Sequence, residues 1–162
     1  GGIDEAATTK EITYCKNGKV SLAGSYLKKF CGLDSLGQTK ILASLCEQAL
    51  TQSEVFISEG CRMNTLGMSL TNAMFKADAY LVVSLYTDML TIYNRLNERT
   101  GSDKKRDYKQ IQALQKQSMK VAKKWQGIGV RVLQFNSAEQ TPAEEAEIVV
   151  NELSKLGVEI SA

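Results

Sequence analysis

The longest apolar region of the chain lies between Asn64 and Arg99. Apolar residues recur there at intervals of three and four positions, the spacing that places side chains on one face of an α-helix. One set consists of Val82, Tyr86, Met89, Tyr93 and Leu96, and a second set widens the stripe at Leu81, Leu85, Leu90 and Ile92. A helix that is apolar over so wide an arc is typically central. We therefore expect one long central helix here.

Residues 103–125 have the clearest amphipathic pattern. At 100° per residue, an inward-facing set falls within about 100° of arc; it comprises Ile111, Leu114, Ser118, Val121, Ala122 and Trp125. Lysines occupy about 60° on the opposite side; they are Lys105, Lys109, Lys116, Lys120 and Lys123. We expect a helix capped by Ser102 or Asp103, with one side buried and the other forming a basic face.

Three further segments are predicted as helices. The first runs from Leu22 to Phe30 and the second from Asp34 or Ser35 to about Ser58. The third begins at Thr141-Pro142, where Thr141 is the cap, Pro142 takes the first helical position and Glu144 completes a capping box. We expect this last helix to end at Gly157, and its buried edge to consist of Ala146, Val149, Leu153 and Leu156.

Short β elements are predicted near both ends of the chain. Asn17-Gly18 stands between two short apolar alternations and is the strongest two-residue hairpin signal, although a loop after a helical turn capped by Thr8 is the alternative. Between Gly127 and Phe135, two glycines weaken a helix, so we expect a strand or an irregular segment. The tail after Gly157 reads as a final short strand.

Size and composition match those of one globular domain, because the chain has 162 residues, of which 43% are hydrophobic and 23% charged. The patterns predict a mainly α fold, an irregular bundle of about five helices with a small β-hairpin or short strands near the termini. We expect a single domain over residues 1–162. Residues 1–10 would be flexible, 11–61 would hold the cysteines, and 62–162 would be helical.

Four nearly evenly spaced cysteines, Cys15, Cys31, Cys46 and Cys61, lie in the first part of the chain. On one helix, neighbours would be about 22 Å apart, whereas a disulfide needs Cα atoms within roughly 7 Å, so any pairing joins separate elements. Three connectivities exist. We expect two disulfides and favour Cys15 with Cys31 and Cys46 with Cys61; reduced, buried thiols are the alternative.

Two disulfides would indicate an oxidising compartment. The chain also has no N-x-S/T glycosylation sequence, which favours a bacterial periplasmic or secreted protein. Zinc is disfavoured, because the closely spaced cysteine pair and the histidines of ordinary zinc sites are both missing. We expect neither a metal nor a cofactor. No apolar stretch is long and uninterrupted enough for a transmembrane helix.

The chain contains no histidine, which excludes nucleophile triads that use an imidazole base. The phosphate-binding G-x-x-x-x-G-K-[ST] motif is also missing. Carboxylate chemistry remains, as in a glycan hydrolase, with Glu59, Asp78 and Asp88 as candidates. A carrier of a small apolar ligand is another alternative, with Tyr86, Met89 and Tyr93 lining a groove.

Binding without catalysis is the leading hypothesis. The chain would be an adaptor, a surface-structure or secretion accessory, or an inhibitor, and its basic face would bind an acidic protein. Alternatively, that face is merely solvated, and six glutamates among residues 137–162 partly neutralise it. Nucleic acid is disfavoured as a partner, because no aromatic residue besides Tyr108 lies along the basic face. The partner's identity and the oligomeric state stay open.

Overall fold

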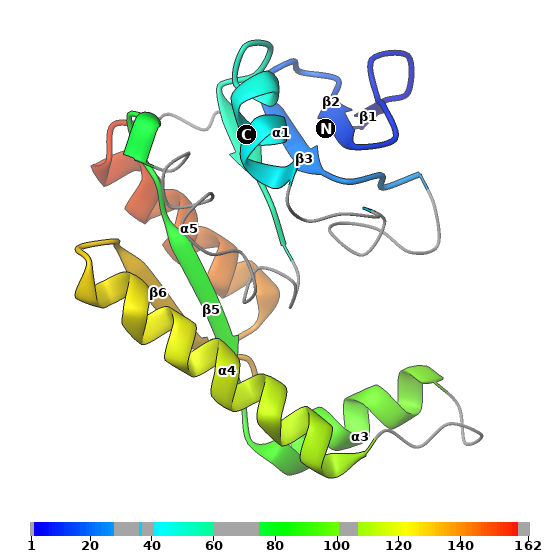
Figure 1. The fold of residues 1–162 in the computed structure, drawn as a ribbon, viewed down its shortest axis with the longest axis vertical. Coiled ribbons are helices and arrows are strands. Elements are labelled where there is room, and N and C mark those ends of the chain that lie inside the picture. Colours follow the sequence, from blue (N-terminus) through cyan, green and yellow to red (C-terminus); the bar gives the residue numbers. More distant parts are fainter. Residues whose placement is uncertain (1, 28–35, 37–40, 60–74, 101–106, 159–162) are drawn as a thin grey trace. The chain divides into compact units, whose positions relative to one another are not determined.

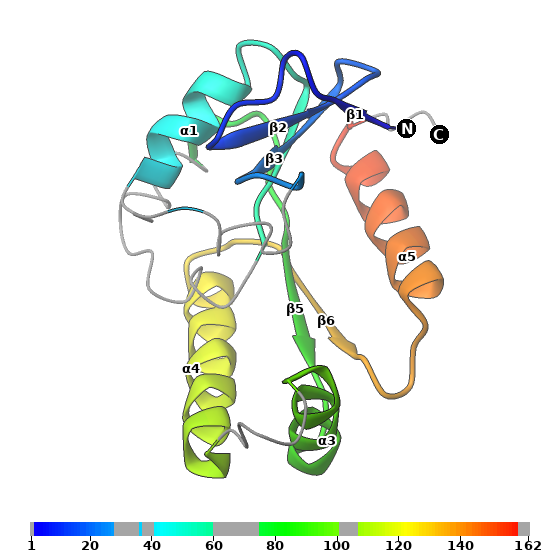
Figure 2. The ribbon, with the colours of Figure 1, turned by 90° about the vertical axis from the view of Figure 1, so that its right-hand side faces the viewer.

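Strands as well as helices build this protein, so the expected mainly α bundle is wrong. The computed structural model describes residues 2–27, 36, 41–59, 75–100 and 107–158. Within them lie four helices, a four-stranded sheet and a two-stranded sheet (Figure 1, Figure 2). The chain divides into two compact units, Gly1–Ala77 and Asp78–Ala162, and each is described by itself.

The N-terminal unit contains the four-stranded sheet. Its strands are β1 (Ile3–Asp4), β2 (Ile12–Cys15), β3 (Val20–Ala23) and β4 (Val55–Ile57), in the order β1-β2-β3-β4. The first three pair antiparallel, whereas β4 runs parallel to β3. Three consecutive residues of β2, Ile12, Thr13 and Tyr14, are buried. Since neighbouring side chains of a strand point to opposite faces, β2 is covered on both sides.

The predicted hairpin at Asn17-Gly18 is confirmed, because it joins β2 to β3. The Asn17 carboxamide oxygen accepts a hydrogen bond from the Lys19 amide at 3.1 Å. Gly18 has a φ of +68°, a backbone conformation that glycine adopts at little cost. Of the two residues only Gly18 has a positive φ, and the Gly18 amide donates to the Cys15 carbonyl at 2.9 Å, so the turn spans Cys15–Gly18 and is not a two-residue loop.

Helix α1 (Leu42–Ala49) is shorter than the helix expected to extend to Ser58. It buries Leu42, Leu45 and Ala49 and packs on β3. The chain after α1 pairs with β3 as strand β4, which suits the apolar and β-branched run of Val55–Ile57. The helix expected from Leu22 to Phe30 is also wrong at its start, because β3 continues to Ala23; residues 28–30 lie outside the described part.

The C-terminal unit is built around a parallel strand pair. Along the chain it contains β5 (Val82–Tyr86), α3 (Met89–Thr100), α4 (Tyr108–Gly127), β6 (Val132–Asn136) and α5 (Pro142–Lys155). Strands β5 and β6 pair in parallel, with Ser84 beside Gln134. Helix α4 packs against both strands and against α3. Trp125, Val130 and Phe135 are buried in this unit.

The long central helix expected between Asn64 and Arg99 is wrong. Among its described residues, Val82–Tyr86 form strand β5, and helix α3 starts only at Met89. Backbone hydrogen bonds to β6 stabilise the strand, beginning with the Val82 amide, which donates to the Arg131 carbonyl at 3.0 Å. Asp88 then caps α3, since its carboxylate accepts from the Thr91 amide at 2.9 Å.

Helix α4 begins later than expected. Asp107 is its N-cap and accepts from the Lys109 amide at 2.9 Å, whereas the predicted caps Ser102 and Asp103 lie outside the described residues. At the other end, Gly129 has a φ of +86° and the chain then enters β6. Of the strand or irregular segment expected between Gly127 and Phe135, the structure shows strand β6 from Val132 onward.

Helix α5 has the predicted start. The Thr141 hydroxyl and the Glu144 carboxylate form the reciprocal bonds of a capping box, with Pro142 at the first position, and Gly157 follows the helix with a φ of +82°. Its expected buried edge is wrong, since no residue of α5 is buried. Leu156, directly after the helix, is 39% exposed, so the apolar side chains expected along this edge contribute little to the buried core. The expected final strand mostly lies outside the described residues.

Candidate functional site

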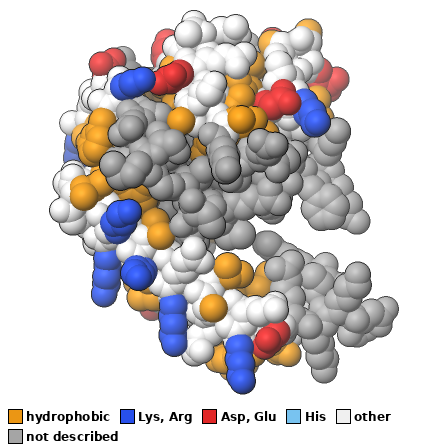
Figure 3. Space-filling model, in the orientation of Figure 1, with side chains coloured by type: hydrophobic (Ala, Val, Ile, Leu, Met, Phe, Trp, Pro, Cys, Tyr) orange, Lys and Arg blue, Asp and Glu red, His pale blue; other side chains and the backbone are white. Residues whose placement is uncertain are grey.

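The basic face is a real surface feature of α4, and from here on it means the lysines Lys109, Lys116, Lys120, Lys123 and Lys124. All of them are exposed, and α4 contains no Asp or Glu. Figure 3 shows basic side chains following this helix along the surface. Lys105, which was expected to extend the face, lies outside the described residues.

Burial of the opposite side of α4 sets the direction of the basic face. Ile111, Ala122 and Trp125 are buried, which points the lysines away from the unit's interior. Leu114 was expected to face inward but is 45% exposed, and Met119 is 44% exposed. The basic face is therefore flanked by apolar side chains that contact water.

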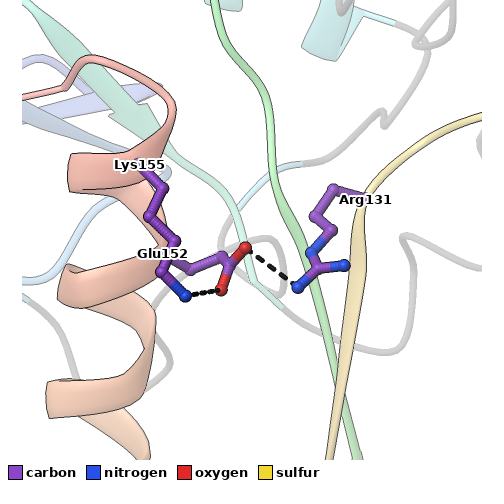
Figure 4. A network of polar contacts seen from close by, with 3 residues as sticks. All are labelled: Arg131, Glu152 and Lys155. Atoms are coloured by element: carbon purple, nitrogen blue, oxygen red, sulfur yellow. Dashed lines mark hydrogen bonds and ion pairs between the residues drawn. The ribbon is translucent and has the colours of Figure 1, made fainter.

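Internal neutralisation of the basic face is not observed among the described residues. In the C-terminal unit, the ion pairs between described side chains join Arg131 to Glu152 at 2.9 Å and Lys155 to Glu152 at 3.2 Å (Figure 4). The hydrogen bond from Lys155, together with the Arg131 guanidinium, lowers the pKa of Glu152. Glu152 thus has local partners of its own, Glu144 belongs to the capping box, and no described ion pair joins a lysine of α4 to a glutamate of α5.

A polar cluster that the sequence analysis missed lies at the carboxyl ends of β5 and β6. The Arg95 guanidinium donates to the hydroxyl and to the carbonyl of Ser137, both at 3.1 Å. Gln115 donates from its side chain to the Thr87 carbonyl at 2.6 Å, and the Ser137 amide donates to the Tyr86 carbonyl at 2.8 Å. These hydrogen bonds join α3 and α4 to the strand ends, whereas the hydroxyl of buried Thr87 has no hydrogen-bond partner among the described residues.

Polar pairs directly after apolar runs were the available signal for this cluster. Thr87-Asp88 follows β5, and Asn136-Ser137 comes at the end of β6. Such pairs are typical of the turns that end parallel strands, which often carry ligand-binding groups. A continuous helix through the region of β5 hides this pattern, because Thr87 and Asp88 then do not follow a strand end.

The three candidate catalytic carboxylates do not form a described catalytic pair. The Glu59 carboxylate accepts from the Tyr26 hydroxyl at 2.7 Å, and Asp78 is exposed. The Asp88 carboxylate accepts hydrogen bonds from the side chain and the backbone of Thr91, which lower its pKa. A general acid for glycan cleavage needs a raised pKa instead, so Asp88 serves as a helix cap.

The expected tyrosine groove loses the helical spacing that suggested it. Tyr86 ends strand β5, whereas Met89 and Tyr93 belong to α3. The Tyr93 ring contacts the Tyr108 ring edge-to-face, with centroids 5.8 Å apart and an interplanar angle of 60°. This contact joins the start of α4 to α3. Binding of an apolar ligand beside these residues stays a prediction.

The expected disulfides are wrong. Cys15 and Cys46 are free thiols, and each of the three connectivities would use both of them. Both are half-buried, and burial, followed by the charge of Glu47, raises the pKa of Cys46. Cys31 and Cys61 lie outside the described residues. The expected periplasmic or secreted location depended on these crosslinks and loses its support.

Comparisons with known proteins give no relative from which a function could be transferred. No family model matches the chain, and neither a curated protein nor a solved structure matches it. None of the described helices is long and apolar enough to cross a membrane. The described part also contains no group of three or more cysteine, aspartate or glutamate side chains arranged to hold a metal ion. The exposed lysines of α4 are therefore the strongest candidate binding feature among the described residues.

Proposed function

We propose that this protein binds another protein non-enzymatically, through the basic face of α4 and an acidic surface on the partner. The supporting observation is that five exposed lysines share one helix with no acidic residue and form no ion pair with any described side chain. Such a face attracts acidic surfaces and accelerates their encounter.

Repulsion along the helix favours a partner of opposite charge. Lys116 and Lys120 are four residues apart, as are Lys120 and Lys124, and like charges at this spacing destabilise a helix by a few tenths of a kcal/mol per pair. Carboxylates on an acidic partner would attract the lysines of both pairs and so offset this repulsion. The helix keeps the lysines nonetheless, which is expected if they serve binding.

A protein partner fits the surroundings of the basic face better than nucleic acid does. Exposed Leu114 and Met119 flank the lysines, and methionine is enriched where proteins meet. Binding of single-stranded nucleic acid would instead need aromatic rings on which bases stack. The ring of Tyr108, at the start of α4, already contacts Tyr93.

Partner capture with matched charge variants tests the proposal. The full chain and a K109A/K116A/K120A variant are used as baits in an extract of the native host, and bound proteins are quantified by mass spectrometry. Alanine preserves the helix, because its helix propensity is the highest. We expect acidic partners to be depleted about tenfold, since three lost charge contacts of about 0.5 kcal/mol each amount to about 1.5 kcal/mol.

A K10A/K16A/K19A variant is the control, because it removes the same charge from the N-terminal unit. It should capture the same proteins as the unchanged chain. Higher salt should weaken capture by the unchanged chain, since exposed charges are screened. Equal capture by both triple variants would contradict the proposed role of the basic face.

A further inference from the structure

Strand β5 is bonded to β6 along one edge, and no described residue pairs with its other edge, which is called the open edge below. The Val82 amide donates to the Arg131 carbonyl at 3.0 Å, and the Tyr86 carbonyl accepts from the Ser137 amide at 2.8 Å. Peptide groups alternate in direction along a strand, so those of Val82, Ser84 and Tyr86 point toward β6. The amides and carbonyls of Val83 and Leu85 therefore point away from it.

The open edge is apolar and unprotected. Val83 is 42% exposed and Leu85 is 56% exposed. The segment from Ala79 to Thr87 contains neither a charged residue nor proline, the usual protections of an exposed edge. No other described strand pairs with β5, and a parallel sheet of two strands is smaller than the usual four to six. This edge is therefore a template for another strand.

We propose that the strand completing this sheet is β5 of a second copy of the chain, paired antiparallel about a two-fold axis through Ser84. Val83 of each copy then lies opposite Leu85 of the other. Because both residues direct their amide and carbonyl outward, each such pair exchanges two hydrogen bonds. The symmetric pairing thus satisfies every outward peptide group of the two exposed residues in both copies.

Cross-strand side-chain pairs favour this register over the symmetric alternatives. A two-fold axis at Val83 would place Asp78 opposite Asp88, two like charges. An axis at Leu85 would place Asp88 opposite apolar Val82. The axis at Ser84 avoids the aspartate pair and places Asp88 opposite Tyr80, and it sets Tyr86 against Val82, an aromatic and β-branched pair of the kind that stabilises antiparallel strands. The side chains of β5 therefore pair favourably with those of β5 in a second copy when the axis passes through Ser84.

The size of the contact sets the expected affinity. One added strand pair covers less than the standard interface of about 1,600 Å². We therefore expect a reversible dimer that forms in the micromolar concentration range and not an obligate one.

Two charge variants of the full chain test both the surface and the register. In V83K/L85K, like charges face each other across the axis, and we expect dimerisation to weaken at least about tenfold. In V83K/L85E, each lysine faces a glutamate of the other copy, so dimerisation should stay within about threefold of the unchanged chain. Sedimentation velocity over a concentration series measures the dissociation constants, and circular dichroism verifies that the variants fold.

Crosslinking provides a second measurement. Ser84 faces Ser84 of the second copy in a non-hydrogen-bonded pair, where Cα atoms are about 4.5 Å apart, within disulfide range. An S84C variant should form an intermolecular disulfide at residue 84, identified by peptide mapping. The control is Q134C, since Gln134 is exposed and neighbours Ser84 on β6 but lies off the proposed axis; it should not crosslink.

Three results would overturn the proposal: a monomeric chain at all concentrations, a V83K/L85K variant that dimerises as tightly as the unchanged chain, or equal weakening in both charge variants. The last result would place the axis at Val83, where lysine faces lysine in both. The proposal does not depend on the basic face of α4, whose lysines are unchanged in all of these variants.

Discussion

A buried serine pair in the N-terminal unit provides the most direct test of the packing. The hydroxyl oxygens of Ser21 on β3 and Ser53 after α1 are 2.6 Å apart, and the two residues are 0% and 8% exposed. Ser53 donates to the Ala49 carbonyl at 2.9 Å, so in this arrangement Ser21 donates to Ser53. The pair connects β3 to the end of α1, directly before β4.

The expected loss in the free energy of unfolding on removing each hydroxyl depends on which hydrogen bonds remain. S21A leaves Ser53 without one hydrogen bond in the core, and we expect a loss of about 1–2 kcal/mol in the free energy of unfolding. S53A should cost a similar amount, because Ser21 keeps only a long contact to the Val55 carbonyl at 3.3 Å. The double variant should cost about 1 kcal/mol less than the sum, because the shared bond is lost only once.

Urea unfolding followed by far-ultraviolet circular dichroism measures these free energies. The single tryptophan, Trp125, lies in the C-terminal unit, so its fluorescence is an internal control for that unit. T51A is the matched control variant, because Thr51 also donates to a backbone carbonyl, that of Gln48, but at an exposed position; it should change stability by less than about 0.5 kcal/mol. Strictly additive costs for S21A and S53A would refute the shared hydrogen bond.

Two further predictions concern titratable groups. Hydrogen bonds from Thr91 lower the pKa of Asp88, so its contribution to stability is complete above the unfolded value of about 3.9 and is lost as the pH falls through the lower folded value. In D88N, the melting temperature measured by calorimetry should be lower near neutral pH and vary less below about pH 4; an unchanged acid dependence would contradict this. Cys15 and Cys46 should both react with iodoacetamide without prior reduction, and the reaction of Cys46 should accelerate as the pH rises through its raised pKa. A requirement for reductant, seen by intact mass, would contradict the free thiols.

Elements that depend on neighbouring residues were predictable from the sequence. The Asn17-Gly18 turn, the capping box of Thr141 and Glu144 and the strand after Gly129 all formed where expected. In each case the signal is a backbone conformation or a hydrogen bond between residues at most three positions apart. At such sites the neighbouring residues determine the local structure, and tertiary contacts are not needed to predict it.

Elements that depend on distant partners were not predictable. The run Val82–Tyr86 fits a helical stripe and a buried strand equally well, and its partner β6 begins about fifty residues later. The segment Val55–Ile57 has the same ambiguity, which its pairing with β3 resolves. The even spacing of the cysteines excluded pairing within one helix, but which thiols meet depends on the positions of separate elements.

Both proposed surfaces belong to the C-terminal unit. Among the described residues, the lysines of α4 have no ion-pair partner, and one edge of β5 has no paired strand. The sequence identified the lysines of α4 but not whether the glutamates of α5 neutralise them, because that depends on where α5 packs. Glu152 instead pairs with Arg131 and Lys155. The open edge of β5 has a different physical basis, since its exposed residues carry no charge. Salt therefore weakens attraction to the basic face but strengthens or leaves unchanged the pairing of β5 edges, so one chain can use the two surfaces independently.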